Sequence, residues 1–196
     1  MTADAAGGVG VFADELAAGR RQRGHQGRVG RGSPIQPAVT AHEAECVWAP
    51  FRLEWMDAGG EASELAADAH RGRTFLAKLG HQWRAELLHS NQFAYVSALE
   101  GVPTLLSVHS DVVSWWRAVY GSPPPDNAYQ RWYRIQAEQA LACAEAIVTP
   151  SQSARRDLLA SFVCPRAVQA IYNTRHPGQF PSRPKTALAV AAGRLW

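Results

Sequence analysis

TLLSVHSDVVSWWRAVYG, residues 104 to 121, carries the clearest structural signal in this sequence. Residues 104–108 are mostly apolar and predict a buried strand. Three polar residues, His109, Ser110 and Asp111, follow directly, and a tryptophan pair comes next in a predicted helix. In open α/β sheets, ligands bind at the carboxyl ends of the strands. The segment therefore predicts a ligand site beside a large aromatic surface.

The same unit, a strand with a polar exit and then a helix, recurs along the chain. This alternation predicts an α/β fold class with a Rossmann-like, doubly wound parallel sheet. The first strand can only be a stub, because six residues precede the first glycine pair. Strands are predicted at 51–56, 86–88, 104–108, 146–149 and 168–172, and helices at 9–20, 61–79, 92–100, 127–144 and 151–162.

Composition divides the chain into three parts. Residues 1–174 form the predicted domain, in which 21–50 are irregular because glycine and proline interrupt a stretch with few apolar residues. Residues 175–186 are polar and proline-rich and predict a linker, and 187–196 predict the first strand of another domain. Three cysteines without Cys-x-x-Cys spacing indicate reduced thiols and a cytoplasmic location. No apolar run is long enough to span a membrane.

Gly7 and Gly8 precede the first predicted helix. A glycine turn at a helix start can bind an anion, because free backbone amides and the helix dipole point toward it. Such pairs are also common as plain turns, and the full G-x-G-x-x-G motif is absent here. The pair alone therefore does not establish a dinucleotide site.

Residues 20–31 contain five arginines and no acid. This segment is either a solvated basic loop or a contact for the phosphates of a lipid, nucleotide or nucleic acid. Aromatic residues and binding motifs typical of nucleic-acid binders are missing, so no nucleic-acid partner is expected. The nearby His42, Glu43, Glu45 and Cys46 match no metal motif, and no metal is expected either.

Seven segments, in order, resemble the N-terminal half of the family 4 glycosyltransferases of the GT-B fold, which are retaining enzymes that use nucleotide sugars. A departure is HQGRVGRGSPIQ, where the family has an apolar second strand. The segments are MTADAAGGVGVFADELA, FRLEWMD, LLHSNQFA, VPTLLSVHSDVVSWWRAVYG, ALACAEAIVTPSQSARRDL, VQAIYNTR and LAVAAGRLW.

The resemblance implies roles for individual residues. His109 matches the histidine beside the transferred sugar and is the expected catalytic residue, although a hydrogen-bonded structural histidine remains an alternative. Gly7, Gly8 and Arg194 match the groups that bind the donor phosphates. The resemblance does not supply a general base, and none is assigned; from its position alone, Asp111 could act as a base or equally cap the following helix. On the acceptor side the expected residues are Asn91, Ser110 and Trp115, although packing is an alternative role for Trp115.

The expected function is hexosyl transfer from a nucleotide sugar to a sugar or lipid-linked acceptor, with the donor as substrate and no separate cofactor. The family's donor-binding domain would follow Trp196, so the chain is expected to be truncated before it and inactive alone. The alternative is a non-catalytic module that binds an acceptor or a partner chain supplying the donor domain. Peripheral contact with a membrane is compatible with either reading. Serine hydrolysis is not expected, because G-x-S-x-G is absent.

Overall fold

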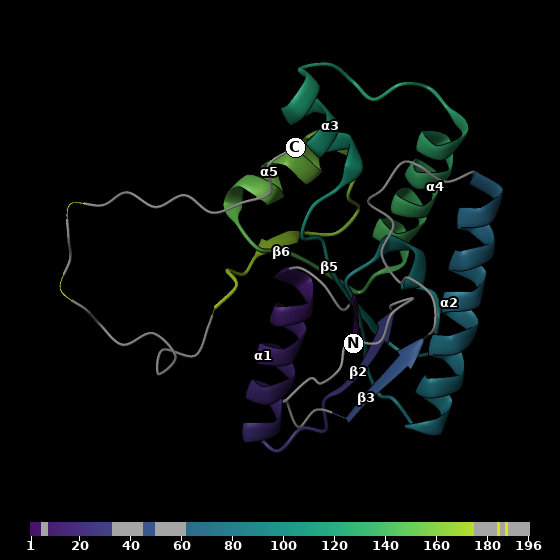
Figure 1. The fold of residues 1–196 in the computed structure, drawn as a ribbon, viewed down its shortest axis with the longest axis vertical. Coiled ribbons are helices and arrows are strands. Elements are labelled where there is room, and N and C mark those ends of the chain that lie inside the picture. The colour runs from purple at the N-terminus through teal and green to yellow at the C-terminus, as the bar shows by residue number, and fades with distance from the viewer. Residues whose placement is uncertain (5–7, 33–44, 50–61, 175–183, 185–186, 188–196) are drawn as a thin grey trace.

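The computed structural model describes residues 1–4, 8–32, 45–49, 62–174, 184 and 187 (Figure 1). Within them, parallel strands alternate with helices. The strands are β1 (Thr2–Asp4), β2 (Arg28–Gly32), β3 (Glu45–Ala49), β4 (Leu88–Ser90), β5 (Thr104–Ser107), β6 (Ala146–Thr149) and β7 (Val168–Ala170). The helices are α1 (Gly8–Gln22), α2 (Ala62–Gln82), the short 3₁₀ helix η1 (Phe93–Tyr95), α3 (Val112–Tyr120), α4 (Ala128–Cys143) and α5 (Gln152–Ser161).

The strands form two parallel sheets, ordered β1-β2-β3 and β4-β5-β6-β7. Helices lie on both sides of the strands: α1 and α5 on one side, α2 and α4 on the other (Figure 1). This confirms the predicted α/β class with parallel strands and helices on both faces. The structure differs in one respect, because the described strands form two separate hydrogen-bonded sheets, whereas the sequence predicts one sheet.

The prediction that residues 21–50 are irregular was wrong in part. Strand β2 lies there and pairs with β1, with Thr2 opposite Gly30, and also with β3, with Val29 opposite Cys46. Hydrophobicity could not reveal β2, because Val29 is its only large apolar residue.

Packing explains why such a polar strand is stable. At Gly30 a Cβ atom would lie 3.1 Å from the Leu76 Cδ2 atom, so the small residue lets α2 approach. The buried guanidinium of Arg31 forms an ion pair with Asp14 of α1. Val29 packs against Ala13 and Ala17 of the same helix. Two helices therefore cover both faces of β2.

Three other predicted elements need correction, and several more lie outside the described residues. The strand predicted at 86–88 runs instead from Leu88 to Ser90, so His89 is inside it and not at its exit. The helix predicted at 92–100 is only the three-residue η1, followed by turns that end at Gly101, whose φ is 71°. The strand predicted at 168–172 ends at Ala170. The strand predicted at 51–56 lies outside the described residues, as do most of 175–186 and 187–196.

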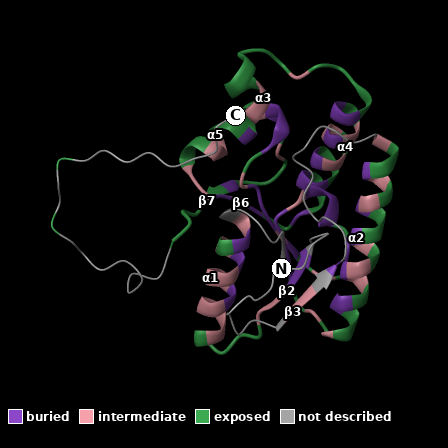
Figure 2. Cartoon of the chain, viewed as in Figure 1, coloured by how far each residue is buried: buried purple, intermediate pink, exposed green. Residues whose placement is uncertain are grey.

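One large apolar core lies around β4 to β7, between the helices (Figure 2). Tyr95 is fully buried there, and a Cβ atom on Gly72 would lie 2.5 Å from its ring. Glycine at position 72 therefore lets α2 pack directly on η1. The other side chains that are at most 1 % exposed include Leu106, Val113, Leu141, Ile147 and Leu158.

The sequence predicts Asp126 or Asn127 as the cap of α4 and Ser151 as the cap of α5, and the structure shows Asn127 and Ser151 in these roles. Asn127 Oδ1 accepts a hydrogen bond from the Gln130 amide at 2.8 Å, and Ser151 Oγ accepts one from the Ala154 amide at 3.0 Å. Each cap satisfies a helix amide that has no partner within the helix. These bonds fix where both helices begin and thus where the preceding turns lie.

The three cysteines are free thiols. Burial raises the pKa of the thiols of Cys46 and Cys164 above its ordinary value. In the described part of the chain, no helix combines the length and apolar character required to cross a bilayer.

Candidate functional site

Two polar exits meet where β4 and β5 end. The strands are parallel neighbours, with Ser90 opposite Leu106, so the residues that follow them emerge at the same edge. There His109 Nε2 lies 3.0 Å from Asn91 Oδ1. The structure thus brings together two residues that the sequence placed on the catalytic and acceptor sides of one site.

The bond to Asn91 fixes the proton arrangement of His109. Asn91 Oδ1 accepts, so Nε2 donates and the neutral ring keeps an unprotonated Nδ1. Burial lowers the pKa of His109 to about 4. The imidazole is therefore neutral at physiological pH, and its unprotonated Nδ1 atom can accept a hydrogen bond.

Phe12 of α1 packs against this histidine. Its ring meets the imidazole of His109 edge to face, with centroids 4.8 Å apart and planes at 69°. It also meets the ring of His89 at 6.0 Å and 80°. Phe12 lies about one turn from the start of α1, so it connects the amino end of that helix to the exits of β4 and β5. From the sequence, the spacing of Phe12 indicates only a place on the apolar face of the helix.

His89 has a different environment from His109. It lies within β4, is 7 % exposed, and its Nε2 atom is 2.7 Å from Ser107 Oγ on β5. Burial, together with nearby positive charge that includes Arg20, lowers its pKa to about 3. The residue therefore links the two strands as a neutral ring. The period of two along a strand is the sequence signal that could have placed His89 and Asn91 on one face.

Asp111 caps α3. Its Oδ1 atom accepts a hydrogen bond from the Ser114 amide at 2.8 Å, and its Oδ2 atom accepts one from Ser114 Oγ at 2.6 Å. Burial raises the pKa of this carboxyl group, partly offset by these bonds. The Val112 amide donates to Tyr133 Oη at 3.2 Å. Of the two roles predicted for Asp111, the structure supports the cap.

The remaining predicted site residues differ in how far the structure describes them. Gly8 is the first residue of α1, whereas Gly7 and Arg194 lie outside the described residues. Ser110 follows His109 and is exposed. Trp115 lies in α3 and packs against Trp116 and Tyr120, with centroids 6.3 and 5.9 Å away, which favours packing as its role.

Comparison with known families covers almost all of this architecture. A model of the glycosyl transferase 4-like domain matches residues 7–174, from the residue before α1 to just beyond β7. This chain belongs to that family. No curated protein matches the chain. The glycosyl transferase 4-like domain thus contains the Asn91–His109 pair, Phe12 and the amino end of α1 within its matched region.

Two further charged features are the Arg31–Asp14 ion pair and the side chains that could bind a metal. Arg31 lies beneath the first turns of α1, where its Nη2 atom is 3.5 Å from the Gly10 carbonyl oxygen and where it pairs with Asp14. Sequence analysis grouped Arg31 with the exposed arginines and missed this pair. In the ranges that the structure describes, no three histidine, cysteine or acidic side chains gather as a metal site; His42 and Glu43 lie outside those ranges.

Proposed function

We propose that this domain forms the acceptor side of a retaining glycosyltransferase of the GT-B fold that takes a hexosyl group from a nucleotide sugar. The observation that carries the proposal is the neutral, oriented His109 at the edge where β4 and β5 end. The family match supports a glycosyltransferase role for the domain as a whole. The nucleotide-sugar donor, the retention of stereochemistry and the identity of the acceptor are parts of what we propose.

His109 suits a position beside a sugar in transfer. The transition state of glycosyl transfer carries positive charge on the sugar ring, which a protonated imidazole would repel. A neutral ring avoids that repulsion, and its Nδ1 lone pair can accept a hydrogen bond from a sugar hydroxyl. Asn91 and Phe12 hold the ring from two directions. In this proposal they are positioning residues, and Asn91 also contacts the acceptor.

The donor phosphates would lie against the amino end of α1. Unpaired amides and the helix dipole favour negative charge there, and Gly8 allows close approach of the ligand. Gly7 and Arg194 are proposed to complete this contact. Arg31 is already paired with Asp14, so it is not assigned to the phosphates. We also propose that transfer needs a separate donor-binding wall and that these residues alone do not catalyse it.

The acceptor is proposed to contact Asn91, Ser110 and Trp115. Next to Trp115 on α3, Val119 and Tyr120 are 47 % and 58 % exposed. Exposed apolar and aromatic side chains on an amphipathic helix suit a lipid-linked acceptor or peripheral contact with a membrane. This part of the proposal rests on α3 alone.

A second candidate function is a non-catalytic module that binds an acceptor or a partner chain. The observation that favours it is the apolar surface directly after β7, where Ile171 and Tyr172 are 57 % and 62 % exposed. A donor-binding partner could cover these side chains.

Titration of the chain tests the first proposal. The NMR signals of the His109 imidazole would be followed while simple glycosides and, separately, nucleoside diphosphates are added. We expect glycosides to shift the His109 signal, and His109→Gln and Asn91→Ala to weaken their binding. Tight nucleoside diphosphate binding, at about micromolar Kd, would contradict the separate donor wall. Unchanged glycoside affinity in both variants would remove the role proposed for His109.

A further inference from the structure

The two sheets leave a cavity between them that opens at the amino ends of the strands and reaches inward to His89. It has a volume of about 560 Å³ and is bounded by the ends of α1 and α2 and by the segments that lead into β2 and β4. This volume lies within the range typical of small-molecule sites. Its lining includes His89 but not His109. We call it the seam cavity.

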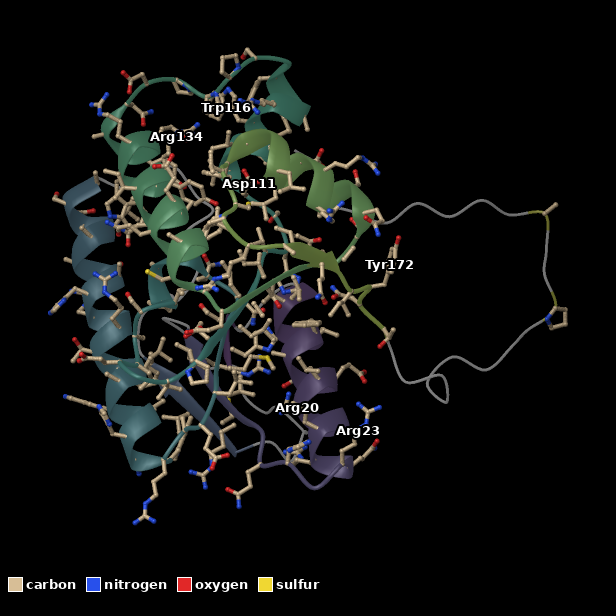
Figure 3. The ribbon with its side chains drawn as sticks, turned by 180° about the vertical axis from the view of Figure 1, so that it is seen from behind. Arg20, Arg23, Asp111, Trp116, Arg134 and Tyr172 are labelled. Carbon is tan, nitrogen blue, oxygen red and sulfur yellow. The ribbon has the colours of Figure 1, made fainter. Side chains whose placement is uncertain are left out.

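Three arginines from different elements line the seam cavity, against one acid, Glu86. Arg20 comes from the last turns of α1, Arg28 from the start of β2, and Arg84 from the turn after α2. Figure 3 shows Arg20 and Arg23 at the end of α1 far from Asp111, which marks the opposite end of the domain. Arginines at helix ends are common because they stabilise the dipole. The helix dipole explains an arginine at the end of a helix, but it does not explain why three arginines from different elements line one cavity.

The charges in the cavity are only partly compensated. Within the described residues, neither Arg20 nor Arg84 forms an ion pair or a side-chain hydrogen bond. The guanidinium of Arg28 lies over the Trp83 ring, 5.3 Å from its centroid. Stacking on an indole orients this guanidinium within the lining of the cavity. An anion entering the cavity would relieve repulsion among these cations.

The backbone at Arg84 adds an independent observation. Arg84 has a φ of 49°, and it is the one non-glycine residue in the described ranges with a positive φ. The turn is closed by hydrogen bonds from the Arg84 amide to the His81 carbonyl at 3.1 Å and from the Ala85 amide to the Gly80 carbonyl at 2.9 Å. Glycine is preferred at this position after a helix. An arginine held here in the left-handed region is a strained choice that a binding role would explain.

We propose that the seam cavity binds a phosphate group, carried by a soluble organic phosphate or by a lipid headgroup. Arginine is suited to this ligand because its forked N–H groups match phosphate oxygens in pairs. Trp83 and Leu87 give the cavity an apolar wall for the organic part of the ligand. The concave shape favours a small phosphate over an extended nucleic acid. The site is distinct from the sugar-transfer edge and does not depend on the function proposed for it.

Calorimetry with inorganic pyrophosphate tests the site in the whole chain, and cosedimentation with vesicles, with and without an anionic phospholipid, tests the headgroup source. The decisive variant is Arg84→Gly, which removes the guanidinium but suits the left-handed backbone, so it should fold at least as well. We expect it, and Arg20→Gln, to lose at least tenfold in affinity. Arg156→Gln removes an exposed arginine from α5 and is the charge-matched control, expected to bind as the unmodified chain does.

A second readout locates the ligand. A bound phosphate next to His89 should raise the low pKa of that imidazole, and it should raise the pKa of His109, which does not line the cavity, by less. Binding of pyrophosphate indicates a soluble phosphate, and binding confined to anionic vesicles indicates a headgroup. Binding of neither, equal loss in Arg156→Gln, or binding of an oligonucleotide alone would overturn the proposal.

Discussion

The two ends of the strands in this domain have opposite electrostatic character. At the carboxyl ends, His109 and Asn91 are neutral, partly or fully buried and hydrogen bonded to each other. At the amino ends, Arg20 and Arg84 point positive charge into the seam cavity without an ion-pair partner among the described residues. A neutral edge suits the hydroxyls of a sugar, whereas a cationic cavity suits an anion. One domain can therefore present two chemically different sites, and motif resemblance reveals only the first.

Acid should destabilise the carboxyl end first. The folded-state pKa values of His109 and His89, about 4 and about 3, lie below the ordinary value for histidine. The unfolded chain therefore binds more protons as pH falls, so their stabilising effect is complete above pH ~6.5 and is lost toward the folded pKa values. We expect a loss of roughly 3 kcal/mol between pH 7 and 5, measured by urea unfolding.

The control for this prediction replaces both histidines, as His89→Gln with His109→Gln. That variant should show a much flatter stability profile over the same pH interval. If its profile falls as steeply as that of the unmodified chain, groups other than these two imidazoles cause the acid sensitivity.

Removing the Phe12 ring should damage the carboxyl end selectively. Phe12→Ala opens space beside both imidazoles and should cost about 2 kcal/mol of folding free energy. It should also raise the pKa of His109 toward its ordinary value, because water gains access to the ring. Phe12→Leu keeps most of the volume and should have a smaller effect on both. Chemical denaturation and NMR titration measure the two effects; an unmoved pKa in Phe12→Ala would show that Phe12 does not shield His109.

The cap at Asp111 should contribute less. Asp111→Ala removes both bonds from Ser114 and should cost about 1 to 2 kcal/mol of folding free energy. Asp111→Asn keeps a capping oxygen and should cost little, because asparagine is an equally good cap. Thermal unfolding compares them, and equal losses would mean that the negative charge matters more than the cap.

The smallest expected effect is a gain at the amino end. Arg84→Gly should stabilise the domain by about 0.5 to 1 kcal/mol, because glycine adopts a positive φ without steric cost. Phe12→Ala should destabilise the domain, whereas Arg84→Gly should stabilise it, because the second substitution removes a strained backbone conformation. A loss of stability in urea unfolding would show instead that the Arg84 side chain supports the fold.

Local signals in the sequence predicted the second half of the domain well. The apolar run of β5 and the capping residues Asn127 and Ser151 predicted element positions because each signal lies within a few residues. Strand β2 could not be found in this way, since Gly30 and Arg31 suit a strand only once α2 and Asp14 are in place.

For the candidate site, the sequence predicted the location but not the contacts made by other elements. Parallel strand exits placed Asn91 and His109 at one edge, and their hydrogen bond agrees with that prediction. The roles of His109, Gly7, Gly8 and Arg194 stay predictions. The contact with Phe12 and the resulting neutrality of His109 depend on how α1 docks on the strands, which no local pattern encodes.

The described strands form two separate sheets, and this separation affects how the domain unfolds. The small cluster of Ala13, Ala17 and Val29 supports the β1-β2-β3 sheet, whereas the large core belongs to β4 to β7. Two helices contact both sheets among the described residues. Phe12 of α1 packs against His89 and His109, while α2 has Leu76 near Gly30 and Gly72 against Tyr95. Amide protons of β1 and β2 should therefore exchange with solvent through partial unfolding, well before those of β5 and β6. The N-terminal sheet would then behave as a less stable cooperative unit, joined to the rest through α1 and α2.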